Sequence, residues 1–263
     1  MAIVLAALNA GAFTGGIFET AARFRELTGA DVEAVSVLAN SDEPIDSTAA
    51  NGDVPLRVLE GPVAPSLLAA LGAPGVIAAV IGARATPGGR RPVGRTAHQV
   101  LAHAHKPVVV VPPEVISPGP FRRLLIPLEA TEESSRAVLE RLCPLLVDPV
   151  ELVVYHAFTD ATVPAMLDRP GYDLEILGKE FLTRHCPYST RVEFCVGPVA
   201  KRMAEAARED DLVVLSWSQD SSPGRALTVR EVLDASVVPV LLLPAAQPDA
   251  PAPGSLYASS SRT

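Results

Sequence analysis

The sequence has little cysteine and no long apolar run, and both shortages narrow the class of protein. Its three cysteines, Cys143, Cys186 and Cys195, are odd in number and show neither CxxC nor Cys/His ligand spacing. We therefore expect buried free thiols, no metal site and a reducing, cytoplasmic location. The longest apolar runs, in HKPVVVVPP and VVPVLLLPAA, fall well short of the roughly 18 residues that a membrane span needs. No membrane contact is expected.

Positive charge is also scarce. The opening MAIVLAALNAGAFTGG has no Lys or Arg before its apolar run, as a signal peptide would require, so we interpret it as a strand. A net charge of -8 and a pI near 5.2 argue against a nucleic-acid-binding protein. Any anionic partner is expected to be small and to meet a local cluster such as Arg84, Arg90, Arg91 and Arg95.

Catalytic signatures are missing as well. There is no GxSxG elbow, and the glycine cluster NAGAFTGG lacks the Lys-Ser/Thr of a P-loop. His98, His103 and His105 fall within one predicted helix, but their spacing does not align them as metal ligands at i and i+4 would be. We therefore predict no catalytic residues, no metal site and no enzymatic activity.

An internal repeat is present throughout most of the chain. GPVAPSLLAALGAPGVIAAVIG begins at Gly61, and GPVAKRMAEAAREDDLVVLS begins at Gly197. AHQVLAHAHKPVVVVPP likewise matches VREVLDASVVPVLLLPA, with Val-Leu, Pro-Val and the closing Pro in the same places. The chain is therefore predicted to be a tandem of two related domains. We assign them to residues 1–112 and 122–245, joined by a Pro-rich linker at 113–121 and followed by a disordered tail at 246–263.

Each half alternates short aliphatic strands with amphipathic helices, which indicates βαβ units around a parallel sheet. The predicted fold is α/β, with two doubly wound, Rossmann-like domains. In the first half, strands are expected near 2–8, 32–38, 55–60, 76–82 and 107–111, and helices near 15–28, 62–72 and 95–105. In the second, strands are expected near 122–128, 150–157, 190–195, 211–216 and 238–243, and helices near 131–143, 172–185, 198–209 and 225–236. The first half has the short polar NSDEPIDSTAANGD in place of the helix at 172–185, and Gly29 is expected to cap its first helix.

The loop IGARATPGGRRPVGRT, residues 81–96, combines glycine and arginine between a predicted strand and helix. Glycines let backbone N–H groups approach phosphate oxygens, and the start of the next helix adds the positive end of its dipole. Arginines supply charge to the same anion. A glycine-rich connection of this kind is also often a tight turn with solvated arginines.

The segment VIGARATPGGRRPVGRTAHQVLAHAHKPVVVVPP resembles the C-terminal signature of universal stress protein domains, and DLVVLSWSQDSSPGRALTVREVLDASVVPVLLLP resembles it more loosely. Nucleotide-binding members carry G-x-x-G, nine residues, then G-[ST], with an Asp after the first strand. The first half keeps Gly82, has Ala85 in place of the second glycine, and reaches Gly94 one residue early. Arg95 then stands in the Ser/Thr position unless Thr96 serves, and Leu8 or Asn9 stands where the family has Asp.

The second half departs differently. Glu129 keeps an acid after the first strand, but Ser216 and Gln219 replace both early glycines. Ala226 and Leu227 replace Gly-Ser, and Asp220 would repel phosphate. Neither half carries the full pattern.

The resemblance implies a stress-response module that binds ATP or another adenine nucleotide in the first half. The residues expected at that site are Asn9, Gly82, Gly88, Gly89, Gly94, Arg95 and Thr96. The alternative is a degenerate pair that acts as a regulatory or scaffolding protein, alone, as a homodimer or with a protein partner. Because similar domains of this family pair through their last strands, we also expect KPVVVVPP and VPVLLLPA to form an intramolecular pseudo-dimer.

Overall fold

The computed structural model gives the arrangement of most of the chain. It describes residues 1–8, 14–38, 54–84, 93–113, 115, 119–127, 132–158, 190–217 and 227–245. The first half contains β1 (Ile3–Leu8), α1 (Thr14–Thr28), β2 (Asp31–Leu38), β3 (Leu56–Glu60), α2 (Val63–Gly72), β4 (Val76–Gly82), α3 (Arg95–His103) and β5 (Val108–Val111). The second contains β6 (Arg123–Pro127), α4 (Glu132–Leu142), the 3-10 helix η2 (Cys143–Leu145), β7 (Glu151–Phe158), β8 (Thr190–Val196), α6 (Val199–Ala206), β9 (Asp211–Trp217), α7 (Leu227–Ala235) and β10 (Val240–Pro244).

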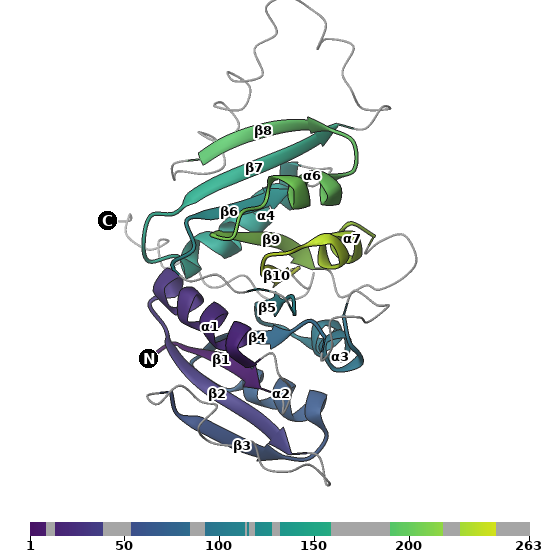
Figure 1. Ribbon diagram of the computed structural model, residues 1–263. Helices are drawn as coiled ribbons and strands as arrows, with labels where there is room; N and C mark the ends of the chain where they lie inside the picture. Colours follow the sequence, from purple (N-terminus) through teal and green to yellow (C-terminus); the bar gives the residue numbers. More distant parts are fainter. Residues whose placement is uncertain are drawn as a thin grey trace, which may run out of the picture.

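All ten of these strands form one sheet, in the order β3-β2-β1-β4-β5-β10-β9-β6-β7-β8. Figure 1 shows it running from β3 at one end of the molecule to β8 at the other. Every neighbouring pair is parallel except β5 and β10, which are antiparallel. The α/β fold and the pairing of the two halves through their last strands are therefore confirmed.

The register of β5 on β10 shows how the halves are related. Val109 faces Leu241, with Val110 opposite Val240 and Val108 opposite Leu242. Val109 and Leu241 hold the same place in KPVVVVPP and VPVLLLPA, so the central pair joins equivalent residues. A pseudo-twofold axis therefore passes through this pair, and each position at the junction has an equivalent position on the other side.

Two apolar layers enclose the sheet. The first contains buried side chains of α1 and α4, such as Phe24 and Leu139, and covers one face. The second contains buried side chains of α2, α3, α6 and α7, such as Leu71, Val100 and Leu233, and covers the other. Because both faces are covered, the central strands are apolar throughout: β5 is four valines, each at most 3% exposed.

Contacts outside the sheet also join the halves. The Val147 amide after η2 donates to the Leu27 carbonyl in α1 over 3.0 Å. Arg23 of α1 is buried, donates from Nη2 to the Glu209 carbonyl over 3.1 Å, and lies 3.9 Å above the ring of Phe121. Burial lowers the pKa of this guanidinium from its ordinary value, and nearby carboxylates oppose that shift.

An ion pair is buried within the second half. Arg123 at the start of β6 donates from Nε and Nη2 to the two carboxylate oxygens of Asp211, over 2.8 and 2.6 Å. The Asp211 side chain is fully buried and also accepts the Arg208 amide over 2.7 Å. Hydrogen bonding to Asp211 raises the pKa of Arg123, so this guanidinium stays charged.

Most expected elements agree with the observed ones to within a few residues. Gly29 ends α1 at a φ of 64°, with its amide on the Arg25 carbonyl over 2.7 Å, as expected for a C-cap. The helix expected over 198–209 ends at Ala206, because Ala207 is extended. Cys143 is a free thiol but is half-buried, whereas we expected it to be buried. The helix expected at 172–185, the polar segment at 40–53 and the tail at 246–263 lie outside the described residues.

Candidate functional site

The strand order of the first half reverses at β1, which defines a candidate ligand edge of the sheet. The chain passes from β1 to β2 on one side and later returns to β4 on the other, so β1 lies between β2 and β4. Helix α1 covers one face and helices α2 and α3 the other. In such sheets the carboxyl ends of the two strands at the reversal leave room for a ligand. In this chain they are the ends of β1 and β4.

Gly82 is the last residue of β4 and lies at this edge. A Cβ atom on Gly82 would meet Ile17 Cδ1 of α1 at 3.4 Å, an ordinary van der Waals distance, so α1 lies directly against the strand end. The residue after Gly82 continues the sheet contact, because the Ala83 amide donates to the Val111 carbonyl over 2.8 Å. The strand end is thereby fixed on both sides.

Gly94 connects this strand end to the start of α3. Its amide donates to the Ala83 carbonyl over 2.7 Å, and its own carbonyl accepts the first helical bond, from His98, over 2.9 Å. Gly94 is the N-cap of α3, with an extended backbone. The amides of Arg95, Thr96 and Ala97 therefore have no acceptor within the helix. Three backbone donors without an acceptor in their own helix therefore lie beside the end of β4.

The charges around these donors favour an anion. Arg95 and Thr96 are exposed in the first turn of α3, and this turn has no acidic residue. The helix dipole adds a partial positive charge at the same end. The structure thus brings together four of the predicted site residues, Gly82, Gly94, Arg95 and Thr96. Asn9, Gly88 and Gly89 lie outside the described residues, as do Arg90 and Arg91.

The corresponding place in the second half has different chemistry. Leu243 of β10 pairs with Ser216, as Val111 of β5 pairs with Gly82, so Ser216 occupies the position of the first glycine. Helix α7 begins at Leu227, which is 56% exposed where the first half has Arg95. Glu129, Gln219, Asp220 and Ala226 lie outside the described residues.

Two ionisable side chains have surroundings that the local sequence does not indicate. Arg84, which the sequence places in the positive cluster, is half-buried and lies 3.6 Å from the Asp234 carboxylate of α7, across the junction of the halves. Tyr155 in β7 is buried, which raises the pKa of its phenol above the ordinary value, and a hydrogen bond with Glu193 raises it further. Neither feature has a signal in the local sequence.

The three histidines of the α3 region do not form a cluster. His98 and His103 lie on α3 and His105 follows the end of that helix; all three are exposed. His103 donates from Nδ1 to the Gln99 carbonyl over 2.9 Å, a contact within its own helix. Within the described ranges, no three His, Cys, Asp or Glu side chains gather in a way that could hold a metal ion. Among the helices described, none has the length and apolar character needed to cross a membrane.

Sequence reasoning did not identify a cavity of about 500 Å³ between the halves. Its lining from the first half includes Ala83, Arg84 and Pro113, next to the end of β4 and β5. Its lining from the second half is the end of α7, from Leu233 to Val238, and the segment Ala207, Arg208 and Glu209 after α6. No local motif predicts this cavity, because it depends on how β5 pairs with β10.

The chain is thus an α/β protein of two like halves in one sheet, with Gly82 and Gly94 at the carboxyl end of β4 in the first. The model of the Universal stress protein family matches residues 20–112. A universal stress protein from Archaeoglobus fulgidus DSM 4304 has a similar structure, with a TM-score of 0.61 and 14% identity over 91% of this chain and 97% of that chain. A candidate universal stress protein from Pseudomonas aeruginosa UCBPP-PA14 gives a TM-score of 0.66 and 14% identity over 92% and 93%. The family model thus covers residues 20–112, and the likeness to these solved structures extends the shared fold over most of the chain.

A protein of unknown function from Pseudomonas aeruginosa PAO1 is also similar, with a TM-score of 0.65 and 14% identity over 92% of both chains. At these identities the structural likeness concerns the fold. A comparison with curated protein sequences gave no match.

Proposed function

We propose that this universal-stress-type protein binds ATP or another adenine nucleotide in its first half, with the phosphates at the start of α3. The observation that carries the proposal is the 2.7 Å hydrogen bond from the Gly94 amide to the Ala83 carbonyl. It holds the free amides of α3 beside the carboxyl ends of β1 and β4, where the order of strands reverses. We further propose a cytoplasmic protein that acts by binding and has no catalytic activity of its own.

Each residue has a distinct part in this proposal. The amides of Arg95, Thr96 and Ala97 donate to phosphate oxygens, and the Thr96 hydroxyl supplies one more donor. The Arg95 guanidinium neutralises charge. Gly82 keeps the strand end open to the ligand, while Gly88 and Gly89 let the loop backbone approach the phosphates. Asn9, which follows β1, would lie near the ribose or the phosphates.

Titration calorimetry of the full chain with ATP, ADP and AMP tests the proposal. We expect saturable binding with at most one nucleotide per chain, because the second half has Ser216 and Leu227 where the first has Gly82 and Arg95. Mass spectrometry of small molecules released from the purified protein gives an independent readout. Two equal sites would contradict the assignment to the first half, and absence of binding at millimolar nucleotide would favour the regulatory or scaffolding function.

Matched variants locate the site. Arg95→Glu should weaken ATP binding at least tenfold, or about 1.4 kcal/mol, because it reverses the charge beside the phosphates. Arg230→Glu makes the same charge change on the exposed surface of α7 and should leave the affinity unchanged. Thr96→Ala and Thr228→Ala form a second pair, since both threonines are exposed second residues of equivalent helices. Equal effects within either pair would argue against binding at α3.

A further inference from the structure

The pseudo-twofold axis relates the 500 Å³ cavity to a place in the molecule that is filled. Trp217 ends β9 in the position that Ala83 holds after β4, because Ser216 pairs with Leu243 as Gly82 pairs with Val111. Leu101 of α3 and Leu233 of α7 are likewise equivalent in the matching HQVLAHAHKPV and REVLDASVVPV segments. The counterpart of a Trp217–Leu101 contact is therefore an Ala83–Leu233 contact across the same junction.

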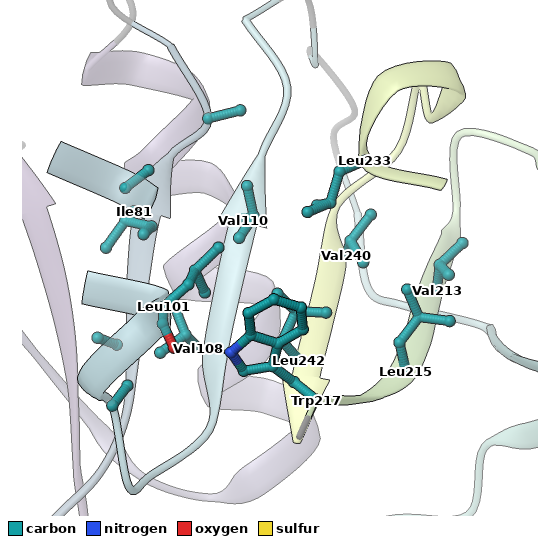
Figure 2. Packing of buried hydrophobic residues seen from close by; sticks show 14 of the residues in the cluster. Ile81, Leu101, Val108, Val110, Val213, Leu215, Trp217, Leu233, Val240 and Leu242 are labelled. Carbon is teal, nitrogen blue, oxygen red and sulfur yellow. Dashed lines mark hydrogen bonds between the residues drawn. The ribbon is translucent and has the colours of Figure 1, made fainter. Parts of the chain in front are cut away.

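The filled side is well defined. The Trp217 ring lies over the junction of β5 and β10, and its nitrogen points at the Leu101 carbonyl (Figure 2). This Nε1 donates to that carbonyl over 2.7 Å, and the indole is buried, at 8% exposed. The C-terminal turn of a helix leaves carbonyls without intrahelical donors, so the indole satisfies one of them while it covers apolar surface.

The equivalent place beside Ala83 and Leu233 has the same backbone arrangement but no indole ring. Ala83 and Leu233 both line the cavity, and Ala83 has a methyl group where the other half has an indole. Its volume of about 500 Å³ lies within the range of about 300–1,000 Å³ usual for small-molecule sites. An aromatic ring placed here by the pseudo-twofold would turn its N–H toward the Leu233 carbonyl, as Trp217 does toward that of Leu101.

The charges at the cavity restrict the ligand further. Arg84 and Arg208 are balanced by Glu209 and Asp234, and the Arg84 guanidinium lies 3.6 Å from Asp234. The Ser236 hydroxyl, also in the lining, donates to the Val238 carbonyl over 2.7 Å. A ligand with a large net charge would meet a group of the same sign, so the balance favours a neutral or zwitterionic molecule.

We propose that this cavity is a binding site for a small neutral or zwitterionic aromatic heterocycle with a ring N–H, which takes the place that the Trp217 side chain fills on the other side. The cavity adjoins the proposed nucleotide site, because Ala83 lines it and also accepts the Gly94 amide, but ligand binding there does not depend on nucleotide binding. One molecule binds per chain, because Trp217 occupies the equivalent space.

Fluorine NMR of 5-fluoroindole with the full chain tests this proposal. We expect saturable line broadening with one site per chain, and at least fivefold weaker binding of 5-fluoro-1-methylindole, in which the ring N–H is replaced. Ala83→Trp should abolish binding, because it places at the open side the ring that the other side already holds. No saturable binding to the natural sequence, or equal binding of the two probes, would overturn the proposal.

A second variant tests the same site in case Ala83→Trp does not fold. Ala235 lines the cavity, is exposed at the end of α7, and has the larger His103 as its equivalent on α3, so Ala235→Trp should fold and weaken probe binding at least fivefold. His103→Trp is the matched control beside the filled side and should leave probe affinity unchanged. Unaltered affinity in Ala235→Trp, or an equal loss in His103→Trp, would place the probe elsewhere and refute the assignment.

Discussion

Trp217 and Leu101 are 116 residues apart in the sequence, yet the indole Nε1 of one donates to the carbonyl of the other over 2.7 Å across the junction of the two halves. Trp217 is also the single tryptophan of the chain. Its fluorescence therefore reports on the junction itself. Because the halves share one sheet, we expect the tryptophan emission and the far-ultraviolet circular dichroism to change together in a denaturant titration.

The first prediction concerns this hydrogen bond. Trp217→Phe keeps an aromatic ring but leaves the Leu101 carbonyl without its donor, which should cost about 1–3 kcal/mol of unfolding free energy, measured by urea denaturation with circular dichroism. Ser66→Ala is the control: the Ser66 hydroxyl also donates to a carbonyl, that of Glu60, but over 3.4 Å and in an exposed position. An equal, small loss of unfolding free energy in both variants would show that the Trp217–Leu101 hydrogen bond contributes no more to stability than an exposed one.

The second prediction concerns Gly29. Its φ of 64° is unfavourable for other residues, and a Cβ atom there would meet Val147 Cγ1 at 3.3 Å. Gly29→Ala should therefore lower the unfolding free energy by at least about 1–2 kcal/mol, measured by the same titration. Gly72→Ala is the control, because Gly72 ends α2 with nothing within 4 Å of the added Cβ, and it should be neutral or slightly stabilising. Comparable losses in the two variants would contradict the reasoning.

The third prediction concerns the buried Arg123–Asp211 pair. Arg123→Met leaves a fully buried carboxylate without its partner and should cost about 3–5 kcal/mol in chemical denaturation. Asp211→Leu added to it should recover much of that loss, although the Arg208 amide also loses its acceptor. Arg57→Met, which breaks the partly exposed Arg57–Glu33 pair at 2.7 Å, should cost no more than about 1 kcal/mol. A double variant less stable than Arg123→Met would count against this account.

The fourth prediction concerns pH. Burial and Glu193 raise the pKa of Tyr155 in the folded chain, while an unfolded tyrosine has a pKa of about 10. The contribution of the protonated phenol is therefore complete below about pH 10 and is lost as the pH rises above it. The unfolding free energy should fall more steeply above that pH in the natural sequence than in Tyr155→Phe, as denaturant titrations across the alkaline range would show. Parallel curves would mean that Tyr155 ionises as freely in the folded chain as in the unfolded one.

The fifth prediction concerns the arginines of the loop after β4. Replacing Arg90, Arg91 and Arg95 together by Ala should weaken ATP binding at least tenfold, about 1.4 kcal/mol, in titration calorimetry. A matched change of three exposed cations in the second half, Lys201, Arg202 and Arg230 to Ala, should leave the affinity unaltered. Equal affinity in the loop variant and the natural sequence would exclude the arginines from the site.

Local patterns in the sequence predict much of the fold and part of the site. The Gly-Pro turns and the two Pro-Val strands indicate the tandem halves, and the family resemblance implies the pairing of β5 with β10. Gly82 and Gly94 are brought together as their loop suggests. The contacts across the junction could not be predicted in this way. The four valines of β5 specify burial but no register, and the register decides that Trp217 meets Leu101 and that Arg84 faces Asp234. Single residues far apart in sequence carry no periodic signal of such contacts.

Joining the two halves in one polypeptide has a consequence for how this interface can diverge. In a dimer of identical chains, any substitution at the junction appears on both sides of the axis at once. Here the two positions are separate codons, so a tryptophan can fill one side while an alanine leaves the other open. The junction is therefore no longer symmetric. Trp217 of the chain itself fills one end of the β5–β10 pair, and the cavity at the other end can accept a ligand.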